Sequence, residues 1–377
     1  MSQKDSNVVL EPYQLDHLKF QKIIFWILQI LQGNVESGIK GSFLKKFIAP
    51  GFMIIVIFTN VLNAFCDIEG DPVIVITSSL LVFVSICQVF CKVIVIIYFS
   101  ENIQEIINWI GLLHVDTSWT TLGVFMKERF EVSLRYLRIV TMTIYRLGLL
   151  AAEFMALTFF LKGILLFRMP FLLLSMQYVW QTIAFNIAMS FYISTEFVLM
   201  FFGFYFVAIF NIFLDSIKLM NNEKFIKLSK CHLRNYHKKH LQIMQKLKDF
   251  DRIFFLVKTI QTGSCLPLIV GAFYQIVLYP NIIVTYVMLF GIISQLFEIC
   301  LLGEYFHCKI EEIFRTLYVT KWYEMSQEDK MILLMMMRMT TNPFSLKAAG
   351  MYEINMMAFV GVIKFCFSFC VLLLALV

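Results

Sequence analysis

Seven long apolar segments, separated by loops whose charge alternates, constrain this chain more than any other feature. They lie near residues 48–65, 73–99, 139–161, 179–214, 253–278, 282–302 and 346–377. Most reach the roughly 18–25 residues that a helix needs to cross about 30 Å of hydrocarbon. A mean hydropathy of +0.77 and a charged fraction of 15% exclude an ordinary soluble domain. The sequence therefore predicts an all-α protein with a bundle of seven transmembrane helices.

The charges of the loops predict the orientation of this bundle. Six lysines precede the first segment: Lys4, Lys19, Lys22, Lys40, Lys45 and Lys46. The next loop carries Asp67, Glu69 and Asp71 and no Lys or Arg, and residues 127–138 and 218–248 are basic again. By the positive-inside rule, the N-terminus is cytoplasmic and Val377 lies outside, the reverse of a G-protein-coupled receptor. The net charge of +6 then suits membrane lipids of the inner leaflet, and we expect no nucleic-acid partner.

The chain divides into four expected regions. Residues 1–47 form a cytoplasmic N-terminal segment, with an amphipathic helix over 12–32 at the inner membrane surface or against the bundle. The first six transmembrane helices occupy 48–307, with a basic cytoplasmic loop at 215–250 and a tight turn at 279–281. Residues 308–342 alternate charged and apolar groups at helical period, which predicts a cytoplasmic helical anchor that packs with other subunits. The seventh helix follows at 343–377. No cleavable signal peptide is apparent, so we expect the first transmembrane helix to direct insertion.

Motifs of catalysis and cofactor binding are not found. The sequence has no Walker loop, dinucleotide fingerprint or nucleophile elbow, so we expect neither an enzyme nor a cofactor. Cys231, His232, His237 and His240 could be drawn as a zinc site, but their spacing fits no ligand pattern, and a solvated basic helix is the better interpretation. The nine cysteines are scattered, mostly inside apolar segments, and predict no disulfide framework.

Five ionisable residues lie inside apolar segments, where charges are costly and usually paired or functional. They are Lys92, Arg146, Glu153, Glu196 and Glu298. Glu153 follows Arg146 by seven residues and shares its helix face, and Glu196 can pair with Arg146 or Lys92. We predict a structural ion pair here in preference to a role in gating.

Motifs in the last third of the chain resemble those of insect odorant receptors. They are Gly303-Glu304, Tyr318 with Trp322-Tyr323, the run Pro343-Phe344-Ser345-Leu346, Ala349-Gly350, and Phe367-Ser368-Phe369 before a leucine cluster. Tyr178 and Gln181, after Pro170-Phe171, are also similar to the start of that family's fourth helix. The likeness covers the whole chain in length and topology, and about the last eighty residues in motif.

Two neighbouring groups share this topology. Gustatory receptors carry Thr-Tyr and, five residues later, Gln-Phe in the last helix, whereas this chain has Met351-Tyr352 and Ala358-Phe359. Because Thr and Gln are lost, a gustatory-type receptor channel is the second choice, after an odorant receptor. The coreceptor of the odorant receptors is a longer chain with an extended loop between its fourth and fifth helices. The corresponding loop is short here, so the resemblance favours a ligand-tuning subunit.

The resemblance implies a subunit of an odorant-gated, non-selective cation channel, in a heterotetramer with the coreceptor. The resemblance also implies that the protein is located in the plasma membrane of olfactory sensory neurons. The last helix of each subunit lines one pore, and the matching positions here are Ser368, Val371, Leu372 and Ala375, with Leu372 closest to a hydrophobic gate. Packing of this leucine-rich end against lipid is the alternative. Lys364 shares a face with Ser368, where it would repel cations unless it points toward a neighbouring helix.

By the same resemblance, a small volatile organic ligand binds in the outer half of the bundle, between the second and fifth helices. Ten residues are candidates: Ser79, Phe83, Gly148, Ala152, Met155, Tyr178, Phe185, Met189, Phe273 and Tyr274. Aromatic and methionine side chains suit such a ligand, although with 40 phenylalanines ordinary helix packing is an equal alternative for each. The inverted orientation argues against a metabotropic receptor. The lack of internal repeats argues against a small-solute transporter.

Overall fold

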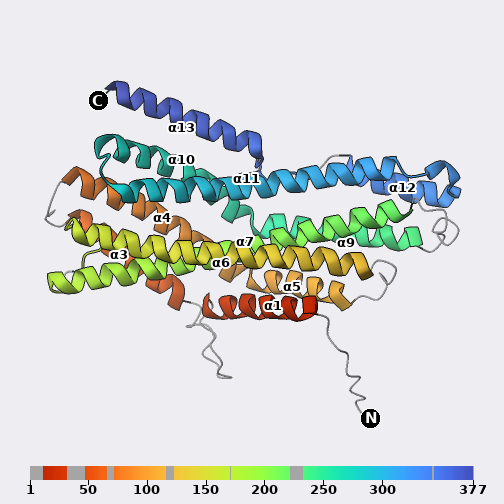
Figure 1. Ribbon diagram of the computed structural model, residues 1–377, viewed down its shortest axis with the longest axis horizontal. Helices are drawn as coiled ribbons and strands as arrows, with labels where there is room; N and C mark the ends of the chain where they lie inside the picture. Colours follow the sequence, from red (N-terminus) through yellow and green to blue (C-terminus); the bar gives the residue numbers. More distant parts are fainter. Residues whose placement is uncertain are drawn as a thin grey trace, which may run out of the picture.

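The computed structural model describes residues 12–31, 47–65, 72–115, 123–169, 171–220, 232–341 and 344–376. These form an elongated bundle of helices that run mostly along its long axis (Figure 1). The prediction of an all-α fold is confirmed. The helices are α1 (Pro12–Leu31), α3 (Ile48–Phe65), α4 (Pro72–Tyr98), α5 (Ser100–Val115), α6 (Gly123–Leu161), α7 (Leu174–Met220), α9 (His232–Ile253), α10 (Phe255–Leu278), α11 (Ile283–Tyr318), α12 (Gln327–Thr340) and α13 (Met356–Leu376).

Seven of these helices correspond to the seven apolar segments. In the described part of the chain, α4, α6, α7, α10 and α11 are long and apolar enough to cross a membrane, and α3 and α13 are shorter apolar helices. The tight turn after α10 is present, because the Ile282 amide donates to the Tyr279 carbonyl at 3.1 Å. It makes α10 and α11 antiparallel neighbours, as predicted.

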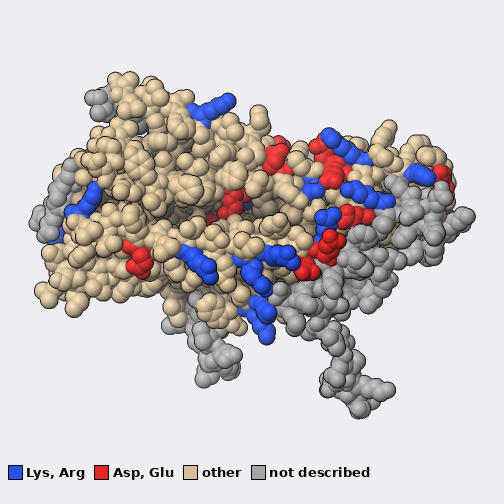
Figure 2. Space-filling view, viewed as in Figure 1, with Lys and Arg blue, Asp and Glu red and all other residues tan. Residues whose placement is uncertain are grey.

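Three helices are much longer than a bilayer is thick. The 47 residues of α7 would extend for about 70 Å at about 1.5 Å per residue, and α6 and α11 have 39 and 36 residues. Lys, Arg, Asp and Glu gather over the end of the bundle formed by α9, α12 and the last turns of α11, while the opposite half shows few charges (Figure 2). The long helices therefore carry the chain out of the apolar half into a polar end. The amphipathic helix α5, which continues from α4, was not predicted.

The core of the bundle is α7. In its most apolar stretch 78% of the residues are buried, compared with 17% for α6. Phe202, Phe206 and Phe210 on α7 pack their rings against Phe250 of α9 and Phe306 of α11 at centroid distances of 5.5 to 6.1 Å. A helix that is apolar on all sides is stable only when its neighbours surround it. The other helices are arranged around this one.

The predicted anchor begins inside α11, which continues without a break through residues 302–318. A short 3-10 helix, η2 (Trp322–Glu324), then turns the chain into α12. The first turn of α12 is capped by Ser326, whose Oγ accepts from the Asp329 amide at 3.3 Å. Buried Leu333 and Met336 lie on the α12 face that packs against α9 and α11. The helical hairpin is thus present, while Asn342 and Pro343, expected to end it, lie outside the described residues.

A small hairpin precedes the last helix. Strands β1 (Lys347–Ala348) and β2 (Tyr352–Glu353) pair antiparallel, with Lys347 opposite Glu353. Ala349 and Gly350 in the turn have φ angles of 52° and 73°. The helical part of the predicted 343–377 segment therefore begins only at Met356. In Figure 1, α13 lies at the edge of the bundle over α10 and α11, with which it makes its contacts.

Candidate ligand cavity and pore helix

Five helices of the apolar half enclose a cavity of about 200 Å³, and the face drawn in Figure 2 is hollowed between α6 and α11. Aliphatic, methionine and aromatic side chains dominate its wall. The lining residues are Val82, Ser85, Ile86, Gln88 and Val89 of α4, Ala151 and Met155 of α6, Phe185, Ala188, Met189 and Tyr192 of α7, Leu268 of α10, and Val287, Met288, Gly291, Ile292 and Gln295 of α11. A site of this kind suits a small and mostly apolar molecule.

Three of the ten candidate ligand residues, Met155, Phe185 and Met189, line this cavity. Phe185 is held by stacking on Phe159 at 6.0 Å and by an edge contact with Phe167 at 5.2 Å. The structure therefore brings together one candidate from α6 and two from α7. They belong to the part of the cavity wall that α6 and α7 supply.

The other seven candidates lie outside the lining. An added Cβ at Gly148 would lie 2.9 Å from Cδ1 of Ile193, so this glycine lets α6 and α7 approach closely. Tyr178 makes an edge contact with Phe160 at 5.2 Å, and Phe273 packs against Phe367 of α13 at 5.3 Å. The remaining four are buried or half-buried and are not among the lining residues: Ser79, Phe83, Ala152 and Tyr274.

The cavity lies deeper in the bundle than the sequence suggested. Counting from the helix ends placed the α4 candidates at Ser79 and Phe83, whereas the lining begins at Val82 and reaches Val89. Reasoning from sequence also missed α11, which supplies five lining residues. Polar residues near the buried charges could have indicated the depth of the cavity. Gln88 precedes Lys92 by one helical turn, and Tyr192 precedes Glu196 by the same interval.

A buried ion pair lies directly behind this polar part of the wall. Lys92 of α4 pairs with Glu196 of α7, and their side chains are 1% and 4% exposed. Gln295 of α11 donates from Nε2 to Glu196 Oε1 at 3.0 Å, and Lys92 Nζ lies 5.6 Å from the ring centroid of Tyr192. One of the two predicted pairings of Glu196 is thereby confirmed. The pair ties α4, α7 and α11 together at the end of the cavity.

The other intramembrane charges have different partners. Glu153 accepts from Asn186 Nδ2 at 3.0 Å, and Arg146 is exposed, so the two share a helix face without pairing in the described residues. Glu298 lies near the Lys92–Glu196 pair, close enough to interact with both charges. Charge is therefore concentrated behind one wall of the cavity.

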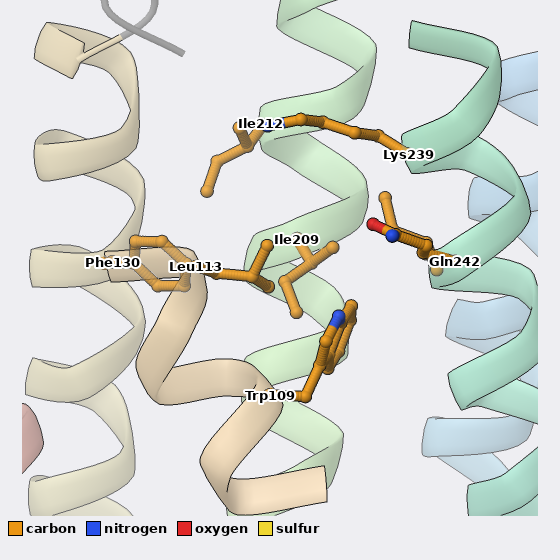
Figure 3. Close-up of a pocket in the computed structure, with 8 residues that line it drawn as sticks. Trp109, Leu113, Phe130, Ile209, Ile212, Lys239 and Gln242 are labelled. Carbon is orange, nitrogen blue, oxygen red and sulfur yellow. The ribbon is translucent and has the colours of Figure 1, made fainter. Parts of the chain in front are cut away.

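A second hollow lies toward the polar end, between α5, α6, α7 and α9 (Figure 3). Trp109, Phe130 and Ile209 form its apolar side, and Lys239 and Gln242 border it from α9. Its volume of about 10 Å³ is room for roughly one water molecule. It is too small for an organic ligand. A wider, more open hollow of about 360 Å³ is bordered by His237, Leu241, Met335, Arg338 and Met339 of α9 and α12. Of these three, the cavity between α4, α6, α7, α10 and α11 is the one in the apolar half with a mostly apolar wall, and it is the candidate site.

The basic helix predicted around the histidines is present as α9. Cys231 lies outside the described residues, and within them no group of three or more His, Cys, Asp or Glu side chains could hold a metal ion. His240 is buried and its ring stacks on Phe213 of α7 at 5.2 Å. Burial, with a smaller contribution from His237, lowers the pKa of His240 to about 4.

The last helix presents two different faces. Cys366 and Cys370 are buried toward the bundle, whereas Ser368 and Leu372 are exposed. At about 100° per residue, these two pairs lie on opposite sides of the helix. Val371 and Ala375 share the outward face, and so does Lys364, which is exposed. All four candidate pore residues thus point away from the helices of their own chain.

A compact joint connects α11 to the start of α13. A Cβ added at Gly303 would lie 1.9 Å from the carbonyl oxygen of Ile354, so no larger residue fits without moving the backbone. The next residue, Glu304, accepts from the Met356 amide at 3.2 Å, and Asn355 Oδ1 accepts from the Ala358 amide at 2.8 Å. A carboxylate and a side-chain cap at a helix N-terminus both stabilise it. Gly303-Glu304 therefore fixes where α13 begins.

Seven apolar helices, a cavity among five of them and a last helix with an open apolar face define a multi-pass helical membrane protein with an internal cavity. A family model described as 7tm Odorant receptor matches residues 73–367, which is most of the chain. The chain belongs to the odorant receptor family.

Solved structures of one insect receptor share this fold. The olfactory receptor OR5 from Machilis hrabei superposes with a TM-score of 0.76 at 13% identity, over 96% of this chain and 100% of that chain. The same receptor in complex with eugenol gives a TM-score of 0.78 at 12% identity, with the same coverage. A comparison with curated protein sequences gives no match.

Proposed function

We propose that this odorant receptor is the odorant-binding subunit of a heteromeric, ligand-gated, non-selective cation channel. The observation that carries the proposal is the apolar cavity of about 200 Å³ between α4, α6, α7, α10 and α11. A volatile organic molecule fits a site of this size and lining. The complex of OR5 with eugenol supports a small organic ligand here as well.

The proposed route from ligand to pore runs through α10 and α11. Both helices line the cavity, and both carry α13: Phe273 of α10 contacts Phe367, and Gly303-Glu304 of α11 hold the segment around Ile354 and Met356. A ligand that spreads the cavity wall displaces these helices and moves α13 with them. The ligand shifts the equilibrium because it binds the displaced arrangement more tightly.

The proposed pore is formed by the outward faces of α13 from four subunits. Ser368, Val371, Leu372 and Ala375 line it, and the ring at Leu372 is the gate. Large apolar side chains around a narrow pore exclude water, so ions meet a desolvation barrier until the ring widens. The exposure of all four residues supports this assignment, because lipid or another subunit must cover them.

The proposed partners are coreceptor subunits, which assemble with this chain through the anchor at 308–342. Exposed apolar residues at that end support a subunit interface: Tyr318, Val319, Trp322, Tyr323, Met331, Leu334 and Met335. In the proposed orientation the N-terminus is cytoplasmic, and the receptor lies in the plasma membrane of olfactory sensory neurons. An epitope after Val377 is then labelled on intact cells and one before Met1 only after permeabilisation. The opposite labelling contradicts this orientation.

Whole-cell recording across an odorant panel tests the proposed function. We expect current when the chain is expressed with the coreceptor, and little or none from the chain alone. Gly291 lines the cavity and has no atom within 4 Å of an added Cβ, so Gly291→Leu fills the cavity without disturbing neighbours near the backbone. It is expected to raise the half-maximal odorant concentration by roughly tenfold or more.

Gly263→Leu is the matched control, because Gly263 also has nothing within 4 Å of an added Cβ and lies outside the cavity lining. It should leave odorant sensitivity unchanged. Surface biotinylation shows that both variants reach the membrane. If Gly291→Leu reaches the surface and responds to every odorant like the wild type, the cavity is not the ligand site.

A further inference from the structure

Lys364 is the only charged residue of α13. Its side chain is exposed, and no hydrogen bond or ion pair joins it to another described residue. The sequence alone left two orientations open, toward a neighbouring helix or along the face of Ser368. At about 100° per residue, Lys364 and Ser368 lie about 40° apart around the helix, and both are exposed. Lys364 therefore points away from its own chain.

The depth of Lys364 distinguishes what can cover this face. The 21 residues of α13 would extend for about 31 Å, which is close to the thickness of the hydrocarbon. Lys364 is the ninth of them, about 12 Å from Met356 along the helix. Against lipid, an ammonium group at this depth is costly and has to bend back toward the interface, whereas water keeps it hydrated where it is. The charge of Lys364 thus favours water on this face.

The surroundings of Lys364 leave its charge uncompensated. No residue of α13 is acidic. Gly361, which lies about one turn before Lys364, is exposed and has nothing within 4 Å of an added Cβ. The hydroxyl of Ser368 is one turn further on. An ion that passes along this face would therefore meet the full charge of the ammonium group.

We propose that Lys364 sets the ion selectivity of the channel by lowering its permeability to divalent cations relative to monovalent cations. At the same distance from the ammonium group, Ca²⁺ is repelled with twice the energy of Na⁺, because the Coulomb energy is proportional to the charge of the ion. Rings of charged side chains control selectivity in this way. Other subunits of the proposed heterotetramer complete the ring, so the charge lowers cation permeability without abolishing it.

This inference rests on the proposed function, since it takes the outward face of α13 to line the pore. It goes further in naming a residue that discriminates between ions.

Reversal potentials of the odorant-evoked current test the inference. The receptor is co-expressed with the coreceptor and recorded with Na⁺ and then Ca²⁺ as the external permeant cation, which gives the Ca²⁺/Na⁺ permeability ratio. Lys364→Gln is expected to raise this ratio roughly threefold or more, and Lys364→Glu should raise it further. Lys364→Arg keeps the charge and should keep the wild-type ratio.

Arg146→Gln is the matched control. Arg146 is also an exposed cation in an apolar stretch, but it lies on α6, whereas α13 packs on α10 and α11. Its removal should leave the permeability ratio unchanged. Surface biotinylation and the half-maximal odorant concentration are measured for every variant, and the second should stay near the wild-type value because Lys364 lies outside the cavity lining. If Lys364→Gln does not reach the surface, Lys364→Met is judged by the same criterion.

An unchanged ratio in the neutral and acidic variants overturns the inference, leaves the proposed function standing and assigns Lys364 to the lipid surface. A ratio that rises equally in Lys364→Arg or in Arg146→Gln also overturns it, because the effect is then not due to the charge at this place. If no odorant evokes current from the co-expressed receptor, both the inference and the proposed function fail. A higher ratio in Lys364→Gln and Lys364→Glu, with the wild-type ratio in Lys364→Arg and Arg146→Gln, supports the inference.

Discussion

Helices α7 and α13 are both strongly apolar, yet they are packed in opposite ways. In the most apolar stretch of α7, 78% of the residues are buried by the chain's other helices. On α13, Cys366 and Cys370 are buried, while Val371, Leu372 and Leu374 are 65%, 56% and 55% exposed. Composition alone cannot distinguish the two helices. They differ in how much of their surface is covered by other helices of the same chain.

Under the proposed mechanism, this difference separates a helix that stabilises the folded monomer from a helix that gates the pore. The most apolar stretch of α7 is packed mainly by its own chain, which also supplies the partner of its buried Glu196, so α7 stabilises the monomer. The open face of α13 is left for lipid or for other subunits, and its firmest attachment is the joint at its first turn. A helix held at one end and along one face can move without unpacking the core. We expect mutations at the contacts of the two helices to differ accordingly.

The largest expected effect comes from the joint. In Gly303→Ala the new methyl group meets the backbone oxygen of Ile354 at 1.9 Å, which requires the α11–α13 joint to shift. Odorant-evoked current should be lost even where protein reaches the surface. Gly263→Ala, which meets nothing within 4 Å, should behave like the wild type. Normal current from Gly303→Ala would show that the joint does not position α13.

The next largest effect concerns the buried ion pair between Lys92 of α4 and Glu196 of α7. Lys92→Met leaves Glu196 buried without its counter-ion, which costs about 3–5 kcal/mol. Surface expression and thermal stability in detergent should therefore fall. The double variant Lys92→Met with Glu196→Gln removes both charges and keeps an acceptor for Gln295, so it should recover most of the stability. A single variant as stable as the double one would contradict the role of the pair.

The smallest of these effects is a pH dependence at the polar end of α7. Burial against Phe213 lowers the pKa of His240 to about 4, from about 6.5 in an unfolded chain. Between these values only the unfolded chain binds the proton. Stability is therefore complete above about pH 6.5 and decreases as the pH falls toward 4, by up to about 3 kcal/mol.

Melting of the detergent-solubilised receptor between pH 7 and pH 5 measures this dependence. His240→Phe keeps the ring contact with Phe213 and removes the titration, so its melting temperature should fall less with pH than that of the wild type. Equal slopes in the two proteins would show that another group is responsible.

Most of the fold could be predicted from the sequence, because the bilayer imposes a simple length rule. The seven apolar segments became α3, α4, α6, α7, α10, α11 and α13, and the resemblance in the last third identified the family. The helix ends were less predictable. Amphipathic helices outside the long apolar runs have no strong hydropathy signal, so α5 was missed and the length of α6 was underestimated.

The cavity was predicted only in part, for a geometric reason. Met155, Phe185 and Met189 were chosen from chain position and chemistry, and these line it. Helix depth and rotation depend on packing between distant segments, and one step along a helix turns a side chain by about 100°. On α4, Ser79 comes about one turn before the first lining residue, Val82, and Phe83 lies within the lining stretch without being a lining residue, and their part in ligand binding stays a prediction. The exposure of the outward face of α13 agrees with both interpretations of the sequence, a pore lining and packing against lipid, and does not choose between them.

The most direct test of the account is the basal current of Leu372 variants, recorded with the coreceptor before any odorant is applied. Leu372→Ser and Leu372→Gln should admit water to the closed gate and raise this current, while the odorant sensitivity set by the cavity changes less. The matching change in the coreceptor should enlarge the effect. Phe369→Ser, beside this face, should change it little. If both Leu372 variants reach the surface with unchanged basal current, ion selectivity and pore-blocker sensitivity, Leu372 does not line the pore and its face packs against lipid.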